Sequence, residues 1–125
     1  MLLLETIYSQ EKNGIDIDKV EFNDIISKGG VYVLKDFEIT YEYLDIALEK
    51  EIKKIFIEHN TCEIKDIVIL FYVNEKIPFN YIELALNELD DILTSNIDVI
   101  WGLNNTNKDE KVAKISMLTR MEKIE

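Results

Sequence analysis

The sequence contains few of the residues that cross-link or interrupt a small protein. Among 125 residues there are one cysteine, one proline and four glycines. The single cysteine, Cys62, cannot close a disulfide within the chain, so the fold must rest on packing alone. Because glycine and proline are scarce, we expect long helices and strands joined by short loops. The length predicts a single domain, 1–125, around one sizeable core.

Positive charge is also scarce. Lysine and arginine together number 14 against 25 acidic residues, which gives a net charge of −11. Such a chain offers little counter-charge to phosphate backbones or anionic lipid, so we expect neither nucleic acid nor membrane as a partner. The N-terminus lacks the basic and apolar regions of a signal peptide, and no apolar run reaches the roughly 18 residues of a membrane helix. We therefore expect a cytoplasmic protein.

Apolar spacing predicts three helices in the body of the chain. A short one covers about 19–28, with Asp18 as its N-cap and the Gly29-Gly30 pair at its end. The next follows Thr40, which we expect to cap it, and a third begins near Pro78. An earlier helix over 2–12 should end at Asn13-Gly14. The apolar positions expected to face the core are Phe22, Ile25 and Ile26, then Leu44, Ala47, Leu48, Ile52, Ile55 and Phe56, then Ile82, Ala85, Leu86, Leu89, Ile92 and Leu93.

Four segments have the composition of strands: 31–34, 67–73, 97–103 and 112–119. Segment 67–73 is apolar throughout, which is typical of a strand covered on both faces and predicts the centre of the sheet. Segment 112–119 alternates apolar and polar residues, so we expect one wet face. Segment 58–65 is polar and is expected to be a loop.

The order of these elements predicts an α+β fold, a four-stranded mixed sheet with two long helices on one face. Right-handed crossovers would place both helices on the same side. The last two strands, joined by the polar turn 104–110, should run antiparallel.

Three short motifs in this order resemble the C-terminal domain of the FtsZ/tubulin family. The run from Gly14 to Phe22 resembles the family's loop Gly-Leu-Ile-Asn-x-Asp-x-x-Asp, with Asp18 at the middle acid, Glu21 at the last and Asp16 in place of Asn. The run 95–102 resembles the strand Asp-Ala-Asn-Ile-Ile-Phe-Gly, and 108–119 resembles the closing hairpin. The resemblance covers essentially the whole chain, and residues 1–14 resemble the end of the helix that leads in from the GTPase domain. The architecture is similar to that of chorismate mutase.

The resemblance implies a role for the acidic loop. In the family its acids enter the nucleotide pocket of the next subunit and orient the water that attacks the γ-phosphate, a task suited to carboxylates. By that analogy Asp16, Asp18 and Glu21 would act in trans, on a nucleotide held by an FtsZ-like GTPase subunit. The family's glycine-rich nucleotide loop has no counterpart here, and Gly29-Gly30 is too short to replace it. We therefore expect no GTP binding, no cofactor and no catalysis by this chain alone.

The same acids have a purely structural interpretation. Asp18-x-x-Glu21 matches a capping box, which stabilises a helix by about 1 kcal/mol. Capping leaves one oxygen of Asp18 free, so the two roles are compatible.

Other candidate sites are weaker. His59 and Cys62 have the spacing of a metal-binding pair, but two further zinc ligands are missing, so an exposed loop is favoured over a metal site. Trp101 and Tyr72 are interpreted as core residues. The acids Glu83, Glu88, Asp90 and Asp91 spread over a helical face rather than forming an acid–base pair. A single histidine without a paired nucleophile excludes a catalytic triad.

Two classes of function remain open. The favoured hypothesis is an assembly domain of an FtsZ-like cytoskeletal or cell-division protein, which binds an FtsZ-like GTPase subunit or pairs with itself as a homodimer. One variant of it is a stand-alone regulator that caps FtsZ filaments. The alternative is a small-molecule binder or chorismate-mutase-like enzyme, against which the single arginine, Arg120, argues, because anionic substrates need several.

Overall fold

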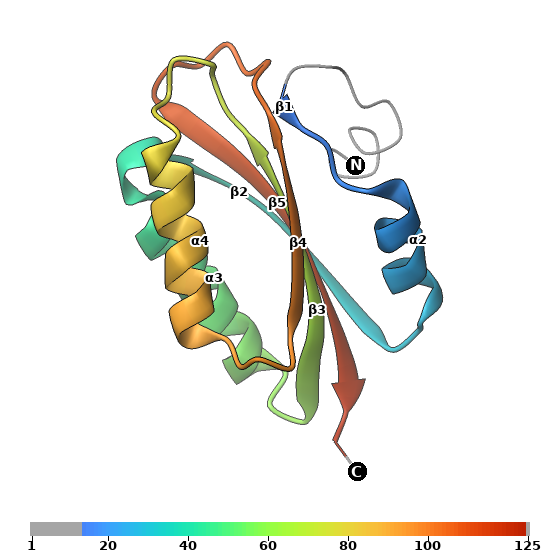
Figure 1. The fold of residues 1–125 in the computed structure, drawn as a ribbon. Coiled ribbons are helices and arrows are strands. Elements are labelled where there is room, and N and C mark those ends of the chain that lie inside the picture. Colours follow the sequence, from blue (N-terminus) through green and yellow to red (C-terminus); the bar gives the residue numbers. More distant parts are fainter. Residues whose placement is uncertain (1–13, 125) are drawn as a thin grey trace.

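The computed structural model describes residues 14–124, and the fold below refers to these residues (Figure 1). The elements in chain order are β1 Gly14–Ile15, α2 Lys19–Ser27, β2 Val31–Thr40, the 3₁₀ turn η1 Tyr41–Tyr43, α3 Leu44–Glu58, β3 Cys62–Tyr72, α4 Asn80–Ile92, β4 Asp98–Asn104 and β5 Val112–Lys123. The expected helix over 2–12 lies outside the described residues.

The strands form one mixed sheet in the order β1-β4-β3-β5-β2. β3 and β4 are parallel, whereas β5 is antiparallel to both of its neighbours, β3 and β2. The short β1 adds two residues to the edge of β4. The predicted α+β class with four principal strands is thus confirmed.

The continuous apolar run of β3 lies at the centre of the sheet, as predicted. Every residue from Ile67 to Phe71 is buried. Helices α3 and α4 cover one face of the sheet, and α2 covers the other (Figure 1). Side chains of a strand alternate between faces, so a strand between two helical layers must be apolar at every position.

Helices α3 and α4 bury a periodic apolar stripe against the sheet. The side chains that form it are Leu44, Leu48, Ile52 and Ile55 from α3, and Ile82, Ala85 and Leu89 from α4. Both crossovers, β2-α3-β3 and β3-α4-β4, step the same way across the sheet with their helices on the same face, so they share one hand. The predicted placement of both long helices on one side is confirmed.

The expectation of a wet face on β5 was wrong. Ser116, Leu118 and Arg120 lie on the face under α2, and all three are buried. β5 pairs with β3 on one side and with β2 on the other over residues 114–121, which makes it a second central strand. β4 and β5 run in opposite directions, but they do not pair, because β3 lies between them. A closing hairpin is therefore not formed.

Several predicted boundaries also needed correction. β2 extends to Thr40, and β3 starts at Cys62, inside the segment expected to be a loop. Thr40 precedes η1 but makes no capping hydrogen bond with its side chain. Ile26 and Phe56, expected in the core, are exposed. These polar strand ends and exposed apolar residues show that local composition marks the core of an element better than its ends.

Two adjacent glycines lie in the turn that joins α2 to β2. Gly29 and Gly30 have φ of 79° and 108°. A Cβ at Gly30 would lie 2.4 Å from the carbonyl oxygen of Met121, whereas one at Gly29 would meet nothing within 4 Å. We expect Gly29→Ala to lower the free energy of unfolding by about 1 kcal/mol and Gly30→Ala by clearly more, about 3 kcal/mol. Urea unfolding of both variants checks this, and equal losses would contradict it.

Candidate functional site

Asp18 begins α2 and caps it as predicted. Its backbone is extended, and its Oδ1 accepts hydrogen bonds from the backbone N–H groups of Val20 at 2.8 Å and Glu21 at 3.2 Å. The side chain of Glu21 does not return a bond to Asp18 within residues 14–124, so only half of a capping box forms. The carboxylate of Asp18 lies at the surface with Oδ2 outside these two bonds.

The acidic loop, defined as residues 15–18, presents its acids to solvent. Ile17 is 4% exposed and packs into the core beneath α2, while Asp16 and Asp18 on either side of it are exposed. In extended backbone, neighbouring side chains point in opposite directions, so burial of Ile17 turns both acids outward. Gly102 of β4 makes this possible, because a Cβ there would lie 2.7 Å from Cγ1 of Ile17 and 2.9 Å from the carbonyl oxygen of Ile15.

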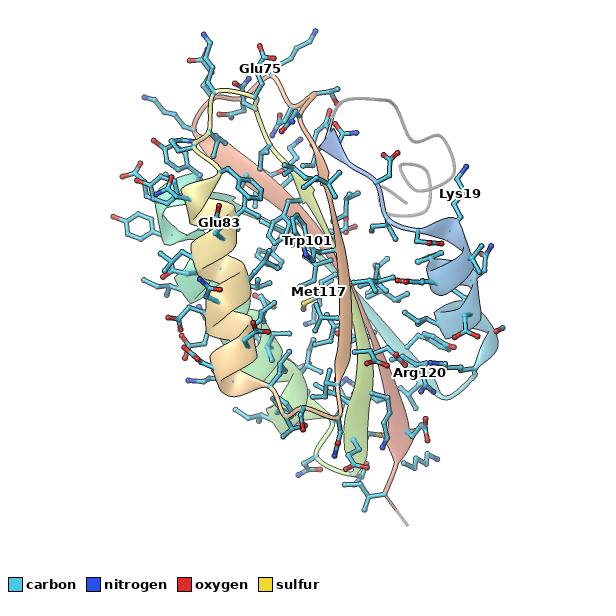
Figure 2. The ribbon with its side chains drawn as sticks, in the orientation of Figure 1. Lys19, Glu75, Glu83, Trp101, Met117 and Arg120 are labelled. Atoms are coloured by element: carbon cyan, nitrogen blue, oxygen red, sulfur yellow. The ribbon has the colours of Figure 1, made fainter. Side chains whose placement is uncertain are left out.

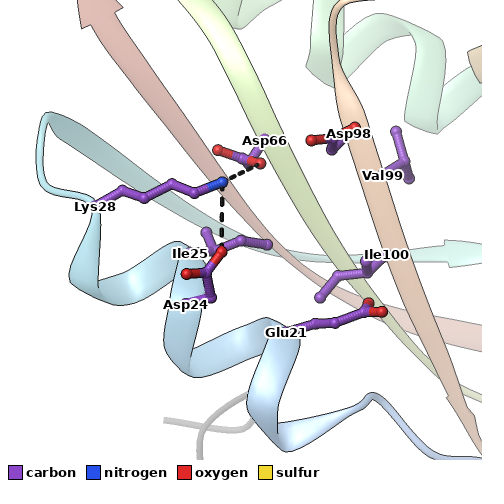
Figure 3. Close-up of a pocket in the computed structure, with 8 residues that line it drawn as sticks. All are labelled: Glu21, Asp24, Ile25, Lys28, Asp66, Asp98, Val99 and Ile100. Atoms are coloured by element: carbon purple, nitrogen blue, oxygen red, sulfur yellow. Dashed lines mark ion pairs between the residues drawn. The ribbon is translucent and has the colours of Figure 1, made fainter.

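A pocket lies between α2 and the edge of the sheet (Figure 3). It encloses about 290 Å³ and is mainly acidic. Its lining residues are Glu21, Asp24, Ile25 and Lys28 from α2, Asp66 from β3, and Asp98, Val99 and Ile100 from β4. Asp66 and Asp98 are direct neighbours in the parallel register of β3 and β4. Glu21 of the predicted site thus belongs to the pocket rim, whereas Asp16 and Asp18 do not line it.

A buried arginine next to the pocket binds Asp66, one of the residues that line it. Arg120 is 5% exposed, and its Nε donates to Oδ2 of Asp66 at 2.6 Å. Its Nη1 donates to the carbonyl oxygen of Gly29 at 2.8 Å, and its Nη2 donates to Oε2 of Glu122 at 2.8 Å. Lys28 adds an ion pair of 3.6 Å to the other oxygen of Asp66, drawn in Figure 3 together with its ion pair to Asp24.

The electrostatics of Arg120 follow from this arrangement. Burial alone lowers the pKa of its guanidinium, but hydrogen bonds to Asp66 and Glu122 offset that effect, so the pKa lies above its ordinary value. The group is permanently charged and fully used in holding β3, β5 and the end of α2 together. It is a structural centre rather than a free substrate-binding cation, and sequence reasoning did not find it.

The C-terminal end of α2 has a second attachment. The hydroxyl oxygen of Tyr32 accepts a hydrogen bond from the N–H of Gly29 at 3.0 Å and lies 2.9 Å from the carbonyl oxygens of Ile25 and Ile26, to which it donates. The last helical carbonyls have no partner within a helix, so the hydroxyl of the half-buried Tyr32 replaces water here. Both ends of α2 are therefore fixed to the sheet.

The remaining predicted candidates lie apart from this region. His59 ends α3 and Cys62 starts β3, and no group of three or more metal-ligating side chains within residues 14–124 is placed to hold a metal ion. Trp101, interpreted as a core residue, is half-buried at the margin of the main core, where it packs edge-on against the buried Phe71 and tilted against the exposed Phe79, with ring centroids 6.2 Å apart in each case. Tyr72 is half-buried as well. Of the acids of α4, Glu83, Asp90 and Asp91 are exposed and Glu88 is half-buried. Figure 2 shows Glu83 in the layer of α4, on the other side of the sheet from Lys19 of α2. Across the described range, no helix combines the length and apolar character needed to span a bilayer.

Comparison with known proteins gives a likeness of structure rather than of sequence. No family model matches the chain, and no curated protein matches it either. The W319Y mutant of FtsZ from M. jannaschii superimposes with a TM-score of 0.73 at 13% identity, over 94% of this chain and 35% of that one. An empty FtsZ dimer from M. jannaschii gives 0.68 at 14% identity, over 96% and 38%. The chain has an FtsZ-like fold.

The match covers nearly all of this chain but only part of each FtsZ chain. This chain spans little more than a third of the FtsZ chains that it matches, which is consistent with the C-terminal domain and fits the motifs found in the sequence. Thiamine monophosphate kinase from Aquifex aeolicus also matches, with a TM-score of 0.50 at 12% identity over 98% of this chain and 41% of that one. All these identities are low, so the comparisons establish the fold and not the activity.

The buried ion pair can be tested by removing one or both partners. We expect Arg120→Met to lower the free energy of unfolding by about 3–5 kcal/mol, because it leaves Asp66 charged in a buried site. The double variant Asp66→Leu/Arg120→Met should lose less than the sum of the two single losses. Urea unfolding of the three variants measures the coupling, and simple additivity would contradict the assigned role.

The packing of the acidic loop against Gly102 can be tested by substituting this glycine. Gly102→Ala should push Ile17 and the backbone of Ile15 away from β4 and lower the free energy of unfolding by about 1–3 kcal/mol. Amide hydrogen exchange should increase in α2 and leave α3 and α4 largely unchanged. Unaltered exchange in α2 would show that the loop does not depend on this contact.

Proposed function

We propose that this chain is a protein–protein assembly domain of the FtsZ type, which presents the acidic loop and Glu21 to the nucleotide site of a partner subunit. It supplies contact and carboxylates, and the partner supplies the nucleotide. The chain needs no GTP site of its own for this role.

The strongest support is the outward projection of Asp16 and Asp18 on a chain with an FtsZ-like fold. Asp18 caps α2 through Oδ1 and keeps its second oxygen outside that cap. A carboxylate held in this way is positioned before a partner arrives, so little side-chain freedom is lost on contact. Glu21, one turn further along α2, lies on the pocket side of the same helix end.

The side chain of Glu21 is longer than that of the Asp at this position of the family's loop, and this difference would affect catalysis. The family's last acid is Asp by the resemblance, and Glu extends the carboxylate by one methylene. A misplacement of about 1 Å can reduce a rate by roughly 100-fold. Binding to a partner should therefore tolerate the change better than water activation does. This favours the variant hypothesis, in which the chain binds the end of an FtsZ filament and limits its growth.

The test is to add the chain to a purified, GTP-hydrolysing FtsZ and measure GTP turnover and polymer sedimentation. We expect the chain to change both. Asp18→Asn keeps the capping acceptor and removes the charge, since Asn caps as well as Asp. Asp18→Asn and Glu21→Gln should each weaken the effect by about 10-fold, the loss expected for a charged contact of about 1.4 kcal/mol.

The matched control is Glu42→Gln, which removes one exposed acid from η1, away from α2 and the acidic loop. It should behave as the unmodified chain does. If neither turnover nor sedimentation changes when the chain is added, or if Glu42→Gln has the same effect as Glu21→Gln, the proposed function is wrong.

A further inference from the structure

The outer side of α3 carries a mainly basic and apolar stripe, here called the α3 stripe and formed by Ile46, Glu49, Lys50, Lys53, Lys54 and Ile57. Ile46 is 60% exposed and Ile57 is 76% exposed, and they lie on the same side of α3 about three helical turns apart. Lys53 is paired with Glu49 at 2.7 Å, whereas Lys50 and Lys54 make no ion pair within residues 14–124. Three lysines within five residues stand out in a chain with a net charge of −11.

The outer side of α4 has the opposite character. Its stripe, here called the α4 stripe, consists of the exposed Glu83, Leu84, Asn87 and Asp91 and the half-buried Glu88. Leu84 is 45% exposed at its centre, and α4 contains no lysine or arginine to neutralise its acids. Each stripe therefore has exposed apolar residues among charges that are mainly of one sign, since the single acid of the α3 stripe, Glu49, is paired with Lys53. The two signs are complementary.

The arrangement of the two helices decides which partner fits. α3 and α4 lie side by side in one layer on the same face of the sheet (Figure 1), and both run antiparallel to β3, because each connects parallel strands. A second copy rotated by a twofold axis parallel to the helices places its α4 over α3 and its α3 over α4. The outer side of α3 in each copy then faces the outer side of α4 in the other copy. The twofold axis forms this contact twice, as an isologous interface requires.

We propose that the outer face of α3 and α4 is a self-association surface, which joins two copies of this chain through reciprocal contacts of the α3 stripe with the partner's α4 stripe. An anionic membrane is disfavoured as the occupant, because the α4 stripe would meet it together with the lysines. An acidic protein that covers only α3 is the remaining competitor, and it does not require this chain to form a dimer by itself, which is what the experiment below measures. This inference does not depend on the proposed role of the acidic loop, which lies on the other face of the sheet.

The interface is small. α4 has 13 residues and is about 20 Å long at 1.5 Å per residue, and packed helices lie about 10 Å apart. A face of that size falls at the lower end of specific interfaces, so we expect a reversible dimer that forms at micromolar concentrations or above. Charge complementarity then acts mainly on orientation and on the choice of partner.

The experiment is a charge exchange followed by sedimentation equilibrium at protein concentrations up to about 1 mM, where even weak dimers form. One variant carries Lys50→Glu, Lys53→Glu and Lys54→Glu, and the other carries Glu83→Lys, Glu88→Lys and Asp91→Lys. We expect the unmodified chain to dimerise and each variant alone to be monomeric, because like charges then face each other twice. A mixture of the two variants should form a heterodimer, since both reciprocal contacts again join opposite charges.

The matched control replaces the exposed Lys108, Lys111 and Lys123 with Glu, which gives the same net charge as the α3 variant with both stripes intact. It should dimerise nearly as the unmodified chain does and should not pair with the α4 variant. Circular dichroism spectra confirm that all variants are folded. A monomeric unmodified chain, or failure of the two folded variants to pair, would overturn the proposal.

Discussion

The buried guanidinium of Arg120 is the interaction on which the arrangement of the sheet and α2 depends. A charge at this depth is tolerated only if its hydrogen bonds are satisfied, and Asp66, Glu122 and the carbonyl oxygen of Gly29 satisfy them from three directions. One side chain of β5 thereby fixes β3 beside it and the end of α2 above it. Asp66 of this ion pair also lines the pocket under α2, so Arg120 holds one residue of that pocket in place.

The position of the acidic loop follows from the two ends of α2. At the C-terminal end, Arg120 and Tyr32 bind the backbone that leaves the helix. At the N-terminal end, Ile17 packs against the bare backbone of Gly102. A helix held at both ends has little freedom to roll, so burial of Ile17 decides that Asp16 and Asp18 face outward. The exposed acids are therefore a consequence of packing on the opposite side of the loop.

Local signals carried most of what the sequence could predict. The unbroken apolar run of β3, the stripe of α4 and the cap at Asp18 each involve neighbours in the chain, and all three predictions were confirmed. The pairing of Arg120 with Asp66 joins residues 54 positions apart and has no local signal. The error on β5 has the same cause, because its polar residues are buried only by virtue of its place between β3 and β2. Ser116 and Arg120 look solvated in the sequence, and only the strand order shows that α2 covers them.

The two faces of the sheet have separate consequences for assembly. The acidic loop and α2 lie on one face, and α3 and α4 lie on the other (Figure 1). Two copies joined through α3 and α4 would keep both acidic loops accessible on the outer sides of the dimer. Because the two loops then face in opposite directions, one dimer would not bind two adjacent sites of a single filament at once, and it would instead bring two separate filament ends together. Self-association and the contact of the loop would therefore act independently on a single filament, without strengthening each other.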